Sequence, residues 1–322
     1  MKKFANWIWI FLGALYGVMF RFGFELIPRA MQEPMSLAFL VATPFAVGAI
    51  SIYGLRNTSL RILDMLFMPW LAVGLMLLGT AITFLEGSIC IAIMSPLFLF
   101  ISSIGGLLMG LALRWRKGKE RPLLCVAIIP FLTLWAETYL DLTRSDITLS
   151  QTTVVKAQPE TIWNEILRAK HIRANELPIS ITHMIGVPKP KEGINIRVNG
   201  DDIRFSVWEK GVHFKAKVIN QEPLRFIKWH YIFSEDSFPK GSMDEHVAIG
   251  GKYFDLKDTA FKLEPIDEYK TRLTITARYK INSSINFYAV PASKLLGNDF
   301  IKTILGLYQQ RSETTERSSN EI

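Results

Sequence analysis

Long stretches without a single charged residue dominate the first 144 residues of the chain. Five of them cover residues 4–20, 34–55, 65–85, 87–113 and 122–136. A helix needs about 20 apolar residues to cross the ~30 Å hydrocarbon core of a bilayer. We therefore predict that residues 1–144 form an all-α transmembrane bundle of about five helices. The first stretch continues beyond Arg21, and the fifth reaches residue 140 only by including Glu137.

Charged residues are distributed unevenly between the two parts of the 322-residue chain. Residues 1–144 hold 12 Lys/Arg and 7 Asp/Glu, whereas residues 145–322 hold 25 and 22. This contrast excludes a single soluble globule, a disordered chain and a disulfide-stapled secreted domain. Because the second part is nearly balanced in charge, the overall net charge of +8 does not predict a nucleic-acid partner.

Basic residues in the short connections predict how the bundle is oriented. They occur at the N-terminus, at Arg56 and Arg61, and in the cluster at residues 114–121, but not in the connection at Glu86. Basic connections stay cytoplasmic, so we expect a multi-pass inner (plasma) membrane protein with a cytoplasmic N-terminus, surrounded by membrane lipids. Five spans place the remaining chain in the periplasm; it is cytoplasmic if residues 122–140 do not cross. The first span lacks a small-residue cleavage site and is expected to be retained.

The second part, residues 145–312, has the alternating pattern of antiparallel strands. The clearest strand is 271–281, and similar patterns mark 147–156, 203–207, 212–218, 225–233 and 254–263. A short helix is expected to begin at Pro159, because proline suits the first helical turn. Apolar residues at helical spacing predict a long closing helix over 291–311. We expect the polar tail 313–322 to be disordered.

The segment Val154-Val155-Lys156-Ala157-Gln158-Pro159-Glu160-Thr161-Ile162-Trp163 resembles the opening of START-like (SRPBCC) domains, which include polyketide cyclases/dehydrases and lipid-transport proteins. The final strand and closing helix also resemble that family, over about residues 145–312. The resemblance implies an α+β helix-grip domain, in which a curved antiparallel sheet surrounds a long C-terminal helix and encloses an apolar cavity. The family has no fixed catalytic set, so the resemblance assigns no catalytic residue.

Apolar side chains on the expected inner face are the candidate ligand-binding residues. We expect them to hold a hydrophobic ligand, either a lipid or a lipid-like or aromatic metabolite, for carriage or sensing at the membrane. The candidates are Phe205, Phe214, Ile227, Trp229, Tyr231, Phe254, Ile275, Tyr279, Leu296, Phe300 and Ile304.

Two other interpretations remain open. One is a cavity enzyme of the cyclase/dehydrase type that uses Asp244, Glu245 and His246 as acid–base groups. The other is a non-catalytic interaction or scaffold protein of the membrane whose protein partner is unknown. No histidine or cysteine spacing predicts a metal site, and no nucleotide or nucleophile motif predicts a cofactor. We therefore expect binding rather than catalysis.

Overall fold

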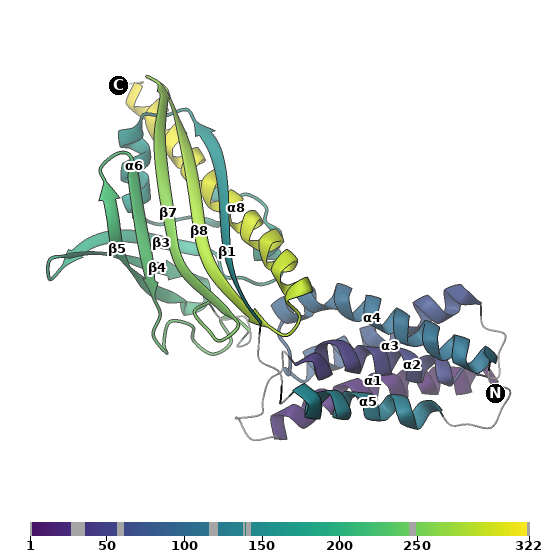
Figure 1. The fold of residues 1–322 in the computed structure, drawn as a ribbon. Helices are drawn as coiled ribbons and strands as arrows, with labels where there is room; N and C mark the ends of the chain where they lie inside the picture. Colours follow the sequence, from purple (N-terminus) through teal and green to yellow (C-terminus); the bar gives the residue numbers. More distant parts are fainter. Residues whose placement is uncertain are drawn as a thin grey trace. The chain divides into compact units, whose positions relative to one another are not determined.

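The computed structural model describes residues 2–26, 36–56, 61–115, 122–137, 139, 143–244 and 249–320. The chain divides into two compact units. The N-terminal unit comprises Met1–Thr143 and Ser283–Ile285, and the C-terminal unit comprises Arg144–Asn282 and Asn286–Ile322. Figure 1 shows that the first unit is helical and that the second contains a large sheet and a long helix.

The described part of the N-terminal unit consists of apolar helices. They are α1 (Lys2–Leu26), α2 (Thr43–Tyr53) with the preceding π-helical turn η2 (Ala38–Ala42), α3 (Ile62–Ile82), α4 (Ser88–Trp115) and α5 (Pro122–Glu137). By length and composition, three stretches could cross a membrane: Trp7–Phe24, Ile62–Ile82 and Ser88–Trp115. The helical stretches Ala38–Tyr53 and Leu123–Glu137 are shorter. All five predicted stretches thus form helices, but among the described residues only three have the length of a full span.

Glycines let α2 and α4 approach each other closely. A β-carbon at Gly105 of α4 would lie 2.1 Å from the carbonyl oxygen of Phe45 in α2. A β-carbon at Gly48 of α2 would lie at the same distance from the carbonyl oxygen of Ser102 in α4. Backbone contact of this kind is typical of helix pairs in membranes, where small residues form the interface.

Charged side chains of this unit are paired inside it. Arg21 lies within α1 with 1% of its surface exposed, and its Nε donates a hydrogen bond to Oε1 of Glu86 at 2.6 Å. Its Nη2 donates to the carbonyl oxygen of Leu85 at 2.9 Å. A buried charge is tolerated only when it is paired. These contacts supply the partners of Arg21 and also join α1 to the connection between α3 and α4.

Glu137 at the end of α5 accepts hydrogen bonds from the start of another helix. Its carboxylate oxygens accept from the backbone N–H groups of Leu37 (2.6 Å) and Ala38 (3.3 Å). The hydroxyl of Ser36 accepts from the next N–H group, that of Phe39, at 3.1 Å. The first N–H groups of a helix have no partner within it, and a carboxylate also opposes the positive end of the helix dipole.

The C-terminal unit is an eight-stranded sheet with helices, and helix α8 runs along the curved sheet (Figure 1). The strand order is β1-β8-β7-β6-β5-β4-β3-β2, and strands β3 to β8 are neighbours in sequence that pair antiparallel. The elements are β1 (Thr143–Val155), α6 (Pro159–Leu167), β2 (Arg168–Ala169), η3 (Ala174–Glu176), α7 (Ile181–Met184), β3 (Pro190–Val198), β4 (Asp201–Trp208), η4 (Glu209–Gly211), β5 (His213–Glu222), β6 (Phe226–Ile232), β7 (Phe254–Asp267), β8 (Lys270–Ser283) and α8 (Asn286–Asn320). A long C-terminal helix against a curved antiparallel sheet is the predicted helix-grip arrangement.

Helix α8 is longer than the sequence predicts. It extends over Asn286–Asn320, so residues 313–320, which we expected to be disordered, are helical. Side chains of this end have partners in the first strand and helix of the unit. Glu313 accepts from the backbone N–H of Lys156 (3.1 Å), and Glu316 accepts from the hydroxyl of Thr161 (2.6 Å). These polar contacts, rather than an apolar stripe, extend the helix.

We predict that Gly105→Ala lowers the thermal stability of the full-length protein in detergent, because the new methyl group would press on the backbone of Phe45. Overpacking of this kind typically costs about 1–3 kcal/mol, which outweighs the ~1 kcal/mol gain in helix propensity. Gly74→Ala is the matched control, since a β-carbon at Gly74 of α3 meets no atom within 4 Å. Equal unfolding temperatures for the two variants would contradict the close approach of α2 and α4.

Candidate ligand-binding site between the sheet and helix α8

Two rows of side chains face each other across the interior of the C-terminal unit. One row is every second residue of β4, and the other is every fourth residue of α8, so each row lies on one face of its element. The rows are Arg204, Ser206 and Trp208 on β4 and Phe300, Ile304 and Tyr308 on α8. Tyr308 accepts a hydrogen bond from Arg204 (3.1 Å), and the ring centroids of Phe300 and Trp208 lie 5.5 Å apart. The middle residues therefore lie between two fixed contacts.

The register of β4 determines which of its residues face the interior. Arg204 pairs with Ala216 of β5, which is fully buried, whereas Phe205 pairs with Lys215. Directly opposite residues in neighbouring strands point to the same face. Phe205, predicted on the inner face, therefore lies on the outer one, where the Nζ of Lys215 is 5.5 Å from its ring centroid.

Arg204 can lie on the inner face because neutral groups hold its guanidinium. Nη1 donates to the carbonyl oxygen of Ile166 (2.7 Å) and to Oδ1 of Asn195 (3.0 Å), and the guanidinium carbon lies 4.8 Å from the centroid of the Trp229 ring. A half-buried cation is stabilised by such hydrogen bonds and by the negative face of an aromatic ring. The alternation of apolar residues along β4 gives no sign of this arrangement.

Aromatic rings continue from Trp208 across the next strands. Trp208 lies 5.2 Å from Phe214 on β5, and Phe214 lies 5.7 Å from Tyr231 on β6. Tyr231 lies 5.9 Å from Phe233, which in turn lies 5.8 Å from Phe238 in the following loop. These distances are those of aromatic pairs in contact, so the rings form one continuous apolar surface.

Several interior residues of this region are not fully buried. Ile304, Tyr231 and Trp208 are half-buried, although all three lie on inward-facing positions. The hydroxyl of Tyr231 donates to Oγ1 of Thr259 at 3.0 Å, and burial raises the pKa of Tyr231 above its usual value. These inward-facing side chains therefore keep part of their surface accessible.

The predicted ligand-binding residues separate into three groups. Ile227, Trp229, Ile275 and Tyr279 are buried in the hydrophobic core, and Phe214 is buried within the ring series. Half-buried positions are held by Tyr231, Phe254, Leu296, Phe300 and Ile304. Phe205 lies outside, as described above. Core packing therefore uses part of the predicted set, and the remainder lies near the facing rows.

His183 is a titratable group of the site that sequence reasoning missed. Its ring centroid lies 5.7 Å from that of Phe300, and its Nδ1 donates to the carbonyl oxygen of Val187 (3.0 Å). Burial lowers the pKa of His183, which keeps the imidazole neutral at pH 7. The buried Nε2 then carries a lone pair with no partner among the described residues.

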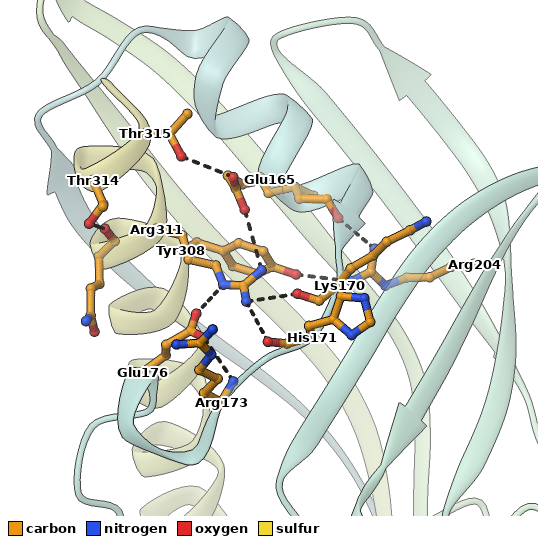
Figure 2. A network of polar contacts seen from close by, with 12 residues as sticks. Glu165, Lys170, His171, Arg173, Glu176, Arg204, Tyr308, Arg311, Thr314 and Thr315 are labelled. Atoms are coloured by element: carbon orange, nitrogen blue, oxygen red, sulfur yellow. Dashed lines mark hydrogen bonds and ion pairs between the residues drawn. The ribbon is translucent and has the colours of Figure 1, made fainter. Parts of the chain in front are cut away.

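A polar network fixes the C-terminal half of α8 (Figure 2). Arg311 forms ion pairs with Glu165 of α6 (3.7 Å) and Glu176 of η3 (2.5 Å), and it donates to the carbonyl oxygens of Lys170 and His171. Burial alone would raise the pKa of Glu176, but the hydrogen bond from Arg311 and its charge outweigh burial and lower it. The network positions Tyr308, one helical turn earlier, toward Arg204 (Figure 2).

Of the predicted acid–base cluster Asp244, Glu245 and His246, the structure describes only Asp244. Asp244 follows the loop that contains Phe238, whereas Glu245 and His246 lie outside the described residues. That hypothesis therefore stays a prediction. Among the described residues, no group of three or more His, Cys, Asp and Glu side chains is arranged to hold a metal ion.

Comparisons with known proteins find similarity in structure alone. No family model and no curated protein sequence matches the chain. Solved structures that are similar include a START superfamily protein from Mycobacterium smegmatis, with 15% identity over 52% of this chain and 98% of that one and a TM-score of 0.34. Norcoclaurine synthase from Thalictrum flavum has 14% identity, coverages of 52% and 86% and a TM-score of 0.33. An aromatase/cyclase from Streptomyces sp. R1128 has 10% identity, coverages of 52% and 94% and a TM-score of 0.32.

The lowered pKa of Asp299 predicts that the protein loses stability in acid. Burial alone would raise its pKa, but hydrogen bonds from Ser180 and Thr182 outweigh burial and lower it from 3.8. A carboxylate with a lowered pKa stabilises the fold above the unfolded value and loses this contribution as the pH falls through the folded value. We expect Asp299→Asn to lower the unfolding temperature at pH 7. The unfolding temperature of this variant should also fall less than that of the wild type when the pH drops below about 4. The control Asp146→Asn, at a side chain that is 79% exposed, should change neither.

Proposed function

We propose that this protein holds a hydrophobic ligand in its C-terminal unit and is anchored in a membrane by its N-terminal helices. One observation carries the ligand proposal. The rows on β4 and α8 are joined at both ends, by Tyr308 with Arg204 and by Phe300 with Trp208. Between these contacts, Ile304 remains half-buried in the interior. Accessible apolar surface between two such contacts suits an apolar guest.

The chemistry of the surrounding side chains indicates the class of ligand. The rings of Trp208, Phe214 and Tyr231 provide apolar walls, and few polar groups interrupt them. Ligand sites of this composition accept lipids and aromatic metabolites. The resemblance of residues 154–163 to START-like domains agrees with this class. Carriage or sensing of such a molecule at a membrane is the function we infer.

The outward faces of the N-terminal helices support the membrane anchor. Soluble proteins rarely expose large apolar patches, whereas membrane helices present apolar residues outward and pack small or polar residues inside. Here Ser51 and Ser102 are fully buried, whereas Leu78 is 55% exposed. Other exposed apolar side chains are Trp7, Phe11, Leu63, Phe67, Phe100, Phe131 and Trp135. Membrane lipids are accordingly the surroundings that we propose for this unit.

We expect the full-length protein, purified in detergent and extracted with organic solvent, to release a lipid or aromatic metabolite that mass spectrometry identifies. Ile304→Trp should reduce the amount released at least tenfold, because the larger ring fills the space between the rows. Val207→Trp places the same ring on the outer face of β4, at a side chain that is 40% exposed, and should leave the amount unchanged. Equal release from both variants would place the ligand elsewhere.

We propose that the N-terminus is cytoplasmic and that the C-terminal unit is periplasmic. This orientation requires α5 to cross the membrane. This helix has 16 residues, fewer than the ~20 of a full span. An alkaline phosphatase fusion at the C-terminus should be active if α5 crosses, because that enzyme folds only outside the cytoplasm. A green fluorescent protein fusion at the same point is the reciprocal control. Bright fluorescence with no phosphatase activity would place the C-terminal unit in the cytoplasm.

A further inference from the structure

The interior guanidinium of Arg204 has no negatively charged partner. It is held by the carbonyl oxygen of Ile166, the amide oxygen of Asn195 and the hydroxyl of Tyr308, all of which are neutral. Among the described residues, it forms hydrogen bonds with these three groups and no ion pair with a carboxylate. Isolated charges inside proteins are costly, and a half-buried arginine normally acquires a counter-ion.

Other arginines of the same unit do have carboxylate partners. Arg311 pairs with Glu165 and Glu176, and Arg278 pairs with Asp258. Arg278 is more exposed than Arg311, with 54% of its side chain accessible against 15%. The fold therefore supplies counter-ions even to a largely exposed arginine. Of the two arginines of this unit that are not exposed, Arg311 has carboxylate partners, whereas Arg204 has none among the described residues.

Hydrogen-bond donors also exceed acceptors around Arg204. A guanidinium has five N–H groups, and three of them are used here, which leaves one on Nε and one on Nη2. The indole Nε1–H of Trp229 is buried and has no partner among the described residues, although its ring contacts the guanidinium. The Nδ2 group of Asn195 is likewise buried and unpaired. Every unsatisfied group identified at this point is a donor.

From this arrangement we propose that the ligand is an amphiphile with an anionic oxygen head group, a carboxylate or a phosphate, which Arg204 binds. The proposal rests on the hydrophobic site proposed above and adds the chemistry of one end of its ligand. An anionic oxygen group supplies the missing charge and can accept from the two unused N–H groups of Arg204, and arginine binds such groups through paired N–H donors.

The position of Arg204 also orients the ligand. It lies at the Tyr308 end of the facing rows, and Ser206 and Trp208 follow it along β4 toward Phe300. A head group at Arg204 therefore places the apolar tail along Ile304 and the aromatic rings. An inverted ligand would leave its charge among these rings and leave Arg204 unpaired.

The test compares four probes on the full-length protein, at a detergent concentration at which micelles do not interfere with the measurement. Two are fluorescent, a long-chain fatty acid and its uncharged methyl ester. Two are unlabelled competitors for the same site, a lysophosphatidic acid and the fatty acid itself. We expect the wild type to bind the acid at least tenfold more tightly than the ester, as is typical for hydrogen bonds to charged groups. Arg204→Met should remove this preference by weakening binding of the acid more than binding of the ester, and Arg204→Lys should retain part of it.

Arg197→Met is the matched control, because Arg197 lies on neighbouring β3 with 73% of its side chain exposed. It should keep the preference for the acid. Competition by the lysophosphatidic acid that exceeds competition by unlabelled fatty acid would identify phosphate as the head group, and the reverse order would identify carboxylate. If the ester and the acid bind equally and Arg204→Met changes neither, the head-group proposal is wrong while the hydrophobic site stands. If no probe binds the wild type, the proposed function fails, and the head-group proposal fails with it.

Discussion

Helix α8 is joined to α6 and η3 by the ion pairs of Arg311, and the interior site depends on this attachment. Arg311 meets one carboxylate from α6 and one from η3, so a single side chain joins three elements. Only with α8 fixed there can Tyr308 reach Arg204 and Phe300 reach Trp208. The sheet provides one wall of the site and the helix the other. The polar network around Arg311 determines how far apart they lie.

Much of the fold could be predicted from residue patterns, and the reasons differ between elements. The alternation in residues 271–281 predicted β8, whose Leu273 and Ile275 are buried as expected. Strand β3 was not predicted, because it begins at Pro190 within a stretch punctuated by prolines. Residues 313–320 were misjudged, because their helix is stabilised by polar partners distant in sequence, which no local pattern reveals.

The candidate site could be predicted less completely than the fold. Aromatic residues such as Phe214, Tyr231 and Phe300 were recognised as inward-facing, but the pattern could not separate fully buried core residues from those that keep accessible surface. Along β4, Phe205 faces outward and Arg204 faces inward, because pairing with β5 overrides the local alternation. Phe205 was therefore assigned to the wrong face. A basic residue within an alternating strand is not by itself a signal of an interior cation.

The contact between Glu137 and the start of the helix at Leu37 has a consequence for the proposed membrane anchor, because it bears on the thickness of membrane that the bundle would fit. The stretch Ala38–Tyr53 is about 24 Å long at 1.5 Å per residue, shorter than a ~30 Å hydrocarbon core. A short span normally thins the bilayer so that its end groups reach water. Here the end groups find a carboxylate and a hydroxyl of the protein instead. With the membrane anchoring proposed above, the helix can begin below the lipid surface, and neighbouring helices rather than lipid length set its depth.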